Sequence, residues 1–372
     1  MRKAKPEKLE KQSIVDGRET RETKETRETT SMRIAIVNNT NASVEIIRRV
    51  IASRPGNEIA WVASNGAKAV EKTAGDKPDL ILMDLILPVM DGVHAIGKIM
   101  KEHPCAILIV TAVVSDHSRV FNAMGKGALD AVGTPVLDAK GNVKGGEELL
   151  KKIEIIARLI GKDNRQAING TTVPAASPGS ACPMVVIGSS TGGPRILTDI
   201  FSGMPAKLGA SIVIVQHVDV QFVNGLIEWL SGYTRLKVVL AETGMRPEID
   251  KVFIAGTNDH LIIGPDLAFH YTAEPKDYPY RPSVDTFFLS VKNYWPEKGV
   301  AVLLTGMGRD GARGLLELRK AGWHTIAQNE KTSAVYGMPK AAAELQAAIE
   351  ILPVEKIANA IIKRIKNREG HL

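Results

Sequence analysis

The stretch V-V-I-G-S-S-T-G-G-P at Val185–Pro194 decides the fold of the second half of this chain. A short run of β-branched residues ends in small residues, and a helical pattern follows from Arg195, which predicts a strand, a sharp turn and a helix. Gly188, Ser190 and Gly192 match the pattern G-x-S-x-G, whose glycines permit a turn that side chains would block. We therefore expect the Ser190 hydroxyl at the carboxyl edge of a sheet, beside the free N–H groups of a helix start.

By itself, G-x-S-x-G is a weak signal. The same residues fit an ordinary strand-to-helix turn or a Gly-rich loop that binds phosphate. A serine becomes a nucleophile only if a base and an acid lie at the same edge of the sheet.

Two other buried strands supply those groups. The run I-V-I-V-Q-H at Ile212–His217 places a histidine just past a strand, and V-A-V-L-L-T-G-M-G-R-D-G-A at Val300–Ala312 places Asp310 in a Gly-rich turn. Because the carboxyl ends of parallel strands meet at one edge, Ser190, His217 and Asp310 are expected to lie together as a catalytic triad. Their chain order differs from the Ser, Asp/Glu, His order of ordinary α/β-hydrolases.

These motifs resemble the catalytic domain of the chemotaxis response-regulator protein-glutamate methylesterases, the CheB family. R-P-S-V-D at Arg281–Asp285 and the segment Ala327–Ala342 extend the resemblance, which is collinear over Cys182–Ile365. It implies a carboxylic ester hydrolase that acts in chemotaxis adaptation. The implied substrates are glutamate methyl esters on the cytoplasmic helices of methyl-accepting chemoreceptors, and many members also deamidate receptor glutamines.

The resemblance also implies roles for individual residues. Ser190 matches the nucleophile, His217 the general base and Asp310 the acid that orients the base. The backbone N–H groups of Thr191 and Met307 match positions of an oxyanion hole, and Thr191 is an alternative cap for the following helix. No metal-ligand cluster is visible in this part of the sequence, so hydrolysis without a cofactor is expected.

Three further residues have competing interpretations. Asp219 is a rival partner for His217, although it lies only two residues away in the chain. His260 is interpreted as a turn histidine rather than a residue near the substrate. Arg309 is either solvated or pairs with acidic residues of a receptor.

The first half of the chain alternates strand and helix patterns, which predicts a parallel sheet covered by helices on both faces. Residues 32–161 resemble a receiver domain, which the methylesterases carry at this end. The predicted fold class is thus α/β with two doubly wound domains, a flavodoxin-like five-stranded receiver and a larger, mostly parallel catalytic domain at 183–372. Residues 1–31 are predicted to be a disordered charged extension, with Met32 as an alternative start, and 162–182 a linker.

The receiver motif departs from the pattern that phosphorylation requires. Asp84 matches the phosphoacceptor of a receiver, and Thr111 matches its hydroxyl residue. Asn38 and Asn39, however, replace the acidic pair, and Thr134 replaces the lysine. Magnesium prefers carboxylate oxygens, so the sequence predicts weak magnesium binding and poor phosphorylation of Asp84.

Composition narrows the function classes. The chain has 372 residues, a net charge of +7 and only two cysteines, Cys105 and Cys182, which suits a reducing, cytoplasmic compartment. No signal peptide or membrane-spanning apolar run is visible, and no basic-aromatic platform predicts nucleic-acid binding. A chemotaxis histidine kinase is a second candidate partner. Two alternatives stay open, a receiver-type signalling adaptor and an esterase for a substrate outside chemotaxis.

Overall fold

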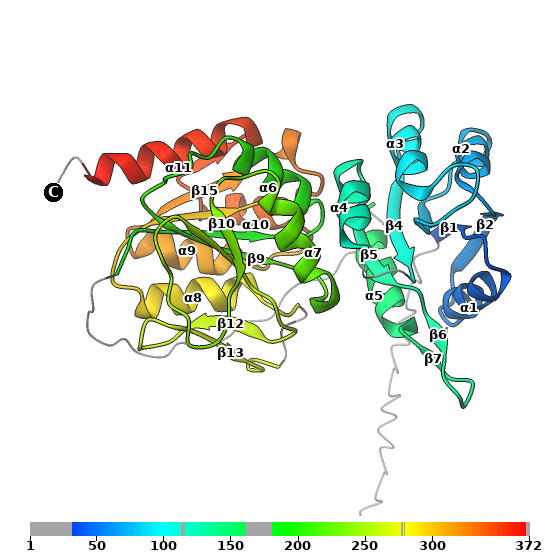
Figure 1. Ribbon diagram of the computed structural model, residues 1–372, viewed down its shortest axis with the longest axis horizontal. Coiled ribbons are helices and arrows are strands. Elements are labelled where there is room, and N and C mark those ends of the chain that lie inside the picture. The colour runs from blue at the N-terminus through cyan, green and yellow to red at the C-terminus, as the bar shows by residue number, and fades with distance from the viewer. Residues whose placement is uncertain (1–31, 113–115, 161–180, 277, 279, 370–372) are drawn as a thin grey trace, which may run out of the picture.

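The computed structural model describes residues 32–112, 116–276, 278 and 280–369, except 161–180. The predicted extension at 1–31 and nearly all of the predicted linker at 162–182 lie outside the described residues. Two large sheets, each covered by helices, dominate the described part of the chain (Figure 1).

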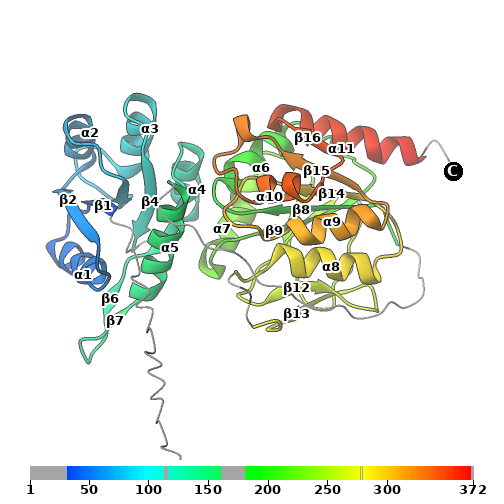
Figure 2. The ribbon, with the colours of Figure 1, turned by 180° about the vertical axis from the view of Figure 1, so that it is seen from behind.

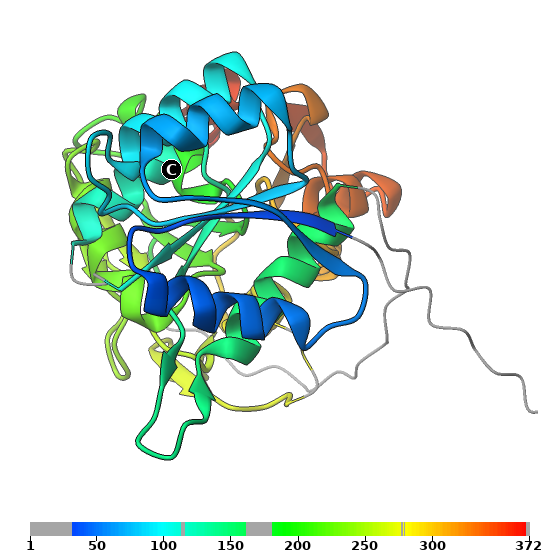
Figure 3. The same cartoon turned by 90° about the vertical axis from the view of Figure 1, so that its right-hand side faces the viewer.

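The first domain is a five-stranded parallel sheet in the order β2-β1-β3-β4-β5. Helices α1 and α5 pack on one face of the sheet, and α2, α3 and α4 pack on the other (Figure 3). The strands are β1 (Met32–Val37), β2 (Asn57–Ala63), β3 (Leu80–Met83), β4 (Ala106–Thr111) and β5 (Asp130–Gly133). The helices are α1 (Asn41–Ala52), α2 (Gly66–Gly75), α3 (Gly92–Glu102), α4 (His117–Gly125) and α5 (Gly146–Leu159). This arrangement confirms the predicted receiver fold.

The second domain is built on a seven-stranded parallel sheet in the order β10-β11-β9-β8-β14-β15-β16 (Figure 2). The strands are β8 (Met184–Ser189), β9 (Ser211–Gln216), β10 (Lys237–Leu240), β11 (Lys251–Ile254), β14 (Val300–Leu303), β15 (His324–Gln328) and β16 (Glu350–Leu352). β8 lies at the centre, between β9 and β14, so the segments that follow these three strands meet at one edge.

Helices cover both faces of this sheet with separate apolar cores. One face carries α6 (Gly193–Ser202), α7 (Val220–Ser231) and α11 (Val354–Glu369), and the other carries α8 (Val284–Tyr294), α9 (Ala312–Lys320) and α10 (Met338–Glu344). A short 3-10 helix, η1, spans Glu330–Thr332. The doubly wound architecture that the sequence predicted is therefore present in both domains.

Several short elements were not expected from the sequence. They are the hairpin of β6 (Val136–Leu137) and β7 (Val143–Lys144), the strand β13 (Phe269–Thr272) and the edge strand β16. β13 pairs antiparallel with β12 (His260–Ile263). Runs of two to four residues are too short to display a period. Among the described residues, no helix combines the length and apolarity needed to cross a membrane.

The two domains contact each other through helices. α4 of the first domain packs against α7 and α6 of the second, and one apolar core cluster continues across this contact (Figure 1). Helix α4 of the first domain thus lies beside α6, the helix that follows the Ser190 turn.

Candidate functional site

The turn after β8 has the shape that its small residues predict. Ser190 directly follows β8, and helix α6 begins after Gly192, whose φ of 77° is in the left-handed region. A Cβ atom at Gly192 would lie 2.5 Å from the Cβ atom of Ala334, so only glycine fits there. The N-cap of α6 is Gly192, which corrects the alternative that Thr191 caps this helix.

Buried polar contacts fix the backbone around Ser190. The Ser190 N–H donates to the carbonyl of Thr305 at 3.0 Å, which ties the turn to the end of β14. Gln216 Nε2 donates to the carbonyls of Ser190 at 2.8 Å and His217 at 3.1 Å. Gln216 was missed by the sequence interpretation, although a glutamine at the end of an apolar strand was a signal for it.

His217 and Asp310 come together as expected. His217 Nε2 donates to Asp310 Oδ2 at 2.8 Å, and both side chains are almost fully buried. The other ring nitrogen, Nδ1, is buried and has no partner among the described residues. Because an ionised carboxylate only accepts, this contact places the proton on Nε2 and leaves the Nδ1 lone pair free to act as a base.

Ser190 follows β8, the strand that pairs with β9, and His217 follows β9. β8 and β9 are paired with Ser189 opposite Gln216, so Ser190 and His217 follow directly from a matched pair of residues. Across the described part of the chain, no direct hydrogen bond joins the Ser190 hydroxyl to the imidazole. Such contacts are often long before substrate binds.

Tyr280 covers one face of the imidazole. Its ring stacks on His217 with centroids 4.6 Å apart and planes 10° from parallel. A Cβ atom at Gly308 would be 3.7 Å from the Tyr280 ring, so this ring extends from the base to the loop that holds Met307. Sequence reasoning gave no role to Tyr280, which precedes the motif R-P-S-V-D.

Asp310 is enclosed by hydrogen-bond donors. The donors to its two oxygens are His217 Nε2, Ser283 Oγ and the backbone N–H groups of Val284, Asp285 and Gly311. Burial alone raises the pKa of this carboxyl, but the hydrogen bond and charge of His217, with the backbone donors, outweigh burial and hold the pKa below its ordinary value. Asp310 is therefore a carboxylate at neutral pH.

A second buried carboxyl group adjoins it. Burial, and then the negative charge of Asp310, raise the pKa of Asp285 to about 7. Its Oδ1 atom accepts a hydrogen bond from the Gly314 N–H at 2.6 Å. Near pH 7 the two carboxyls consequently differ in charge, since Asp310 is ionised and Asp285 is only partly ionised.

The two expected oxyanion donors are available. Within the described residues, the N–H groups of Thr191 and Met307 donate to no other group. The loop that carries Met307 is held by Gly306, whose carbonyl accepts from the N–H groups of Gly337 at 3.1 Å and Met338 at 2.8 Å.

Three residues with competing interpretations are resolved by their contacts. Asp219 caps α7 by accepting from the Gln221 N–H at 2.9 Å, and it is not a partner of His217. His260 was expected to be a turn residue, and this expectation is wrong. His260 begins β12 and is fully buried. The Arg309 side chain forms an exposed ion pair with Glu344 at 3.0 Å.

The carboxyl group of Asp84 in the first domain is already occupied by donors. Asn38 Nδ2 donates to Asp84 Oδ2 at 3.0 Å, and the Leu85 N–H donates to Oδ1 at 2.7 Å. Thr111 also hydrogen-bonds to this carboxyl, while burial, the largest effect, raises its pKa. The hydroxyl of Thr134, at the position of the missing lysine, is buried and has no partner among the described residues.

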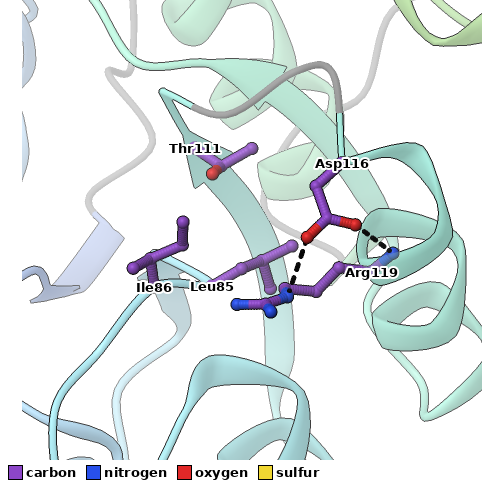
Figure 4. Close-up of a pocket in the computed structure, with 5 residues that line it drawn as sticks. All are labelled: Leu85, Ile86, Thr111, Asp116 and Arg119. Atoms are coloured by element: carbon purple, nitrogen blue, oxygen red, sulfur yellow. Dashed lines mark hydrogen bonds and ion pairs between the residues drawn. The ribbon is translucent and has the colours of Figure 1, made fainter.

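A small pocket is lined by Leu85 and Ile86, the two residues that follow Asp84 in the chain (Figure 4). Its lining includes Thr111 and the side chain of Arg119, which is held by an ion pair with Asp116 at 3.1 Å. In the described residues, no group of three or more His, Cys, Asp or Glu side chains is arranged to hold a metal ion.

The two domains meet close to the Ser190 turn. The N–H of Gly192 donates to the carbonyl of Leu129 in the first domain at 3.4 Å. At the same contact the Glu148 carboxyl hydrogen-bonds to Asp219, and burial together with this acidic neighbour raises the pKa of Glu148 to about 7.

The fold and the site define a two-domain protein in which a receiver is joined to an α/β domain of hydrolase type. The family model "CheB methylesterase" matches residues 185–361, and the model "Response regulator receiver domain" matches residues 34–140. The chain belongs to the CheB methylesterase family.

Relatives match over nearly their whole length. The chain is 50% identical over 329 residues to "Protein-glutamate methylesterase/protein-glutamine glutaminase 3" of Pseudomonas aeruginosa, covering 88% of this chain and 98% of that protein. It is 50% identical over 333 residues to the corresponding protein 1 of Bordetella avium, covering 89% and 97%. The solved catalytic domain of Thermotoga maritima CheB methylesterase is 36% identical, with a TM-score of 0.47, and covers 50% of this chain and 99% of that one.

Proposed function

We propose that this protein hydrolyses glutamate methyl esters on the cytoplasmic helices of methyl-accepting chemoreceptors, in chemotaxis adaptation, with Ser190, His217 and Asp310 as its catalytic triad. The observation that carries the proposal is the imidazole of His217, which is bound to Asp310 through Nε2 and has a free, buried Nδ1 atom beside the Ser190 turn. The names of the relatives support this substrate class and add glutamine side chains.

The proposed steps follow from these atoms. His217 Nδ1 takes the proton of the Ser190 hydroxyl as Oγ attacks the γ-carbonyl carbon of the ester. The N–H groups of Thr191 and Met307 stabilise the oxyanion, and Asp310 stabilises the imidazolium. His217 then protonates the leaving methoxide, which departs as methanol.

The second half of the reaction regenerates the enzyme. Water attacks the acyl-enzyme carbonyl while His217 again takes a proton, and His217 returns that proton to Ser190 Oγ as the bond to Oγ breaks and the glutamate side chain is released as a carboxylic acid, which ionises. A glutamine side chain would react in the same way, with ammonia as the leaving group. These steps use no cofactor.

For the receiver, we propose that Asp84 is a poor phosphoacceptor. The donor set does not fit magnesium, because two neutral amides, Asn38 and Asn39, stand where carboxylates are needed. Asn38 also donates to the oxygen of Asp84 that a phosphoryl group or cation would need. The receiver would then act by docking, and a histidine kinase remains a candidate docking partner for it.

The experiment is methanol release from methyl-labelled receptor. Full-length protein is compared with a Cys182–Leu372 fragment, each with and without acetyl phosphate and magnesium. We expect hydrolysis by both, a faster fragment because α4 no longer packs beside α6 and α7, and no response to the phosphodonor. Hydrolysis of a simple carboxyl ester without methanol release from the receptor would instead favour an esterase for another substrate. Inactivity on both esters would favour a signalling adaptor.

A further inference from the structure

Ser283 is a buried serine that lies against Asp310. It is the N-cap residue of α8, and its hydroxyl donates to Asp310 Oδ1 at 2.9 Å while accepting from the Thr286 N–H at 3.2 Å. A serine hydroxyl has one proton to donate. Since the contact with Thr286 uses the oxygen only as an acceptor, the single proton is left for the carboxylate.

This hydrogen bond holds the oxygen of Asp310 that does not face the base. Oδ2 accepts from His217 Nε2 at 2.8 Å and from the Val284 N–H, and Oδ1 accepts from Ser283 together with the N–H groups of Asp285 and Gly311. The final torsion of an aspartate side chain has a broad energy minimum, so the carboxylate can turn unless both oxygens are held. Together with the two backbone donors to Oδ1, the Ser283 hydroxyl keeps Oδ2 aimed at the imidazole.

His260 fixes Ser283 from the opposite side. Its Nδ1 atom accepts from the Ser283 N–H at 3.0 Å, and its Nε2 atom lies 3.1 Å from the carbonyl of Pro275, to which it donates. The ring is fully buried, and this burial lowers its pKa, so the imidazole is neutral and its proton is on Nε2. A chain of hydrogen bonds therefore runs from Pro275 through His260 and Ser283 to Asp310.

We propose that Ser283 and His260 are positioning residues of the hydrolytic site. Ser283 aligns the Asp310 carboxylate with His217, and His260 holds the backbone of Ser283 in place for that contact. Neither residue touches the reacting atoms. The inference rests on the proposed function, because it assigns both residues to the Asp310–His217 pair.

The test is full-length Ser283→Ala, assayed with methylated receptor and by proton NMR of the His217 Nε2–H. We expect kcat to fall about tenfold with KM nearly unchanged, the size of effect that loss of one hydrogen bond to a charged group produces. With one donor fewer, Asp310 accepts more strongly from the His217 Nε2–H, so the NMR signal of that proton should move downfield. Ser283→Thr keeps the hydroxyl and should restore most of kcat.

Ser290 offers a matched control on the same helix. Its buried hydroxyl donates to the Phe287 carbonyl at 2.7 Å and accepts from the Ile263 N–H at 2.9 Å, with no contact to Asp310. Ser290→Ala should leave kcat and the NMR signal of the His217 Nε2–H unchanged. If Ser290→Ala lowers kcat as much as Ser283→Ala, the loss reflects a weakened α8 and the proposal is overturned.

His260 is tested with two replacements. His260→Leu removes the acceptor for the Ser283 N–H and should lower kcat, whereas His260→Asn supplies an acceptor near the Nδ1 position and should lose less. Should His260→Leu fail to fold, equal kcat in His260→Asn, Ser283→Ala and the unaltered protein would still overturn the proposal. If the unaltered protein releases no methanol, the proposed function fails. The NMR measurement then decides the positioning role separately, since an unmoved His217 Nε2–H signal in Ser283→Ala overturns it.

Discussion

The Phe121 ring of the receiver stacks on the Trp229 indole of the catalytic domain, with centroids 5.5 Å apart and planes 26° from parallel. This contact joins α4 to α7, and α7 begins three residues after His217. The receiver is therefore anchored by an aromatic contact to the helix that follows His217, and groups at this contact can change how firmly the receiver docks.

Docking of the receiver should weaken as pH rises. Burial and the neighbouring carboxyls of Asp219 and Asp130 raise the pKa of Glu148, and Lys152 lowers it. The pKa is about 7 in the docked form, whereas the ordinary value for a glutamate is 4.5. Below about pH 4.5 the carboxyl is protonated whether docked or not, and docking carries no penalty. Between the two values the docked form holds a proton that the separated form does not, so docking weakens until about pH 7 and is constant above it.

Hydrogen exchange of the α7 amides measures this effect. We expect protection, corrected for intrinsic exchange, to fall about tenfold from pH 5.5 to pH 8, because solvent screens a half-buried group. Glu148→Gln should flatten the profile and raise protection at pH 8, while Glu147→Gln, at an exposed neighbour, should behave as the unaltered protein. Equal pH dependence in both variants would remove Glu148 as the cause.

Replacement of the two adjacent serines of the turn by alanine should have very different effects on kcat. Ser190→Ala is expected to lower kcat by about 10³-fold or more without unfolding, because no oxygen remains to form the acyl-enzyme. Ser189→Ala should retain most turnover, since the Ser189 hydroxyl is committed to Gln216 Oε1 at 2.6 Å. Burst kinetics with a chromogenic ester, together with thermal unfolding, distinguish these outcomes. A turnover-competent Ser190→Ala would exclude Ser190 as the nucleophile.

Replacement of Asp310 by asparagine should be nearly as damaging as loss of Ser190. The amide of Asp310→Asn can donate to His217 Nε2, which would drive the imidazole proton onto Nδ1, the atom that must accept from Ser190. We expect kcat to fall about 10³- to 10⁴-fold with a small change in KM. Nitrogen NMR of His217 should report the exchanged tautomer, and an unchanged tautomer with normal kcat would contradict the proposed role of Nε2.

Three substitutions in the receiver should restore phosphorylation of Asp84. Acetyl phosphate with magnesium is not expected to label the unaltered protein, whereas the combination Asn38→Asp, Asn39→Asp and Thr134→Lys restores two carboxylates and a cation and should permit labelling. Adding Asp84→Asn to that combination serves as the control and should abolish the label. Stoichiometric labelling of the unaltered protein at Asp84 would show that the interpretation of Asn38 and Asn39 is wrong.

Motif spacing predicted the long elements and three of the site positions. A strand that ends in G-S-S-T-G-G has few ways to turn, and parallel strands deliver their carboxyl ends to one edge, so Ser190, His217 and Asp310 could be grouped from the sequence. The short strands β13 and β16 could not be found, because four and three residues carry no reliable period. His260 was misplaced in a turn for the same reason.

The sequence by itself determined two doubly wound domains, the residue types of the site and the missing acidic pair of the receiver, since these depend on local pattern and composition. Only the tertiary structure decided which nitrogen of His217 meets Asp310, that Ser283 and His260 support that carboxylate, and that Glu148 meets Asp219 across the domain contact. Each of these relationships joins residues far apart in the chain. They depend on side-chain direction and burial, which are fixed when the sheets and helices pack and which no local sequence pattern encodes.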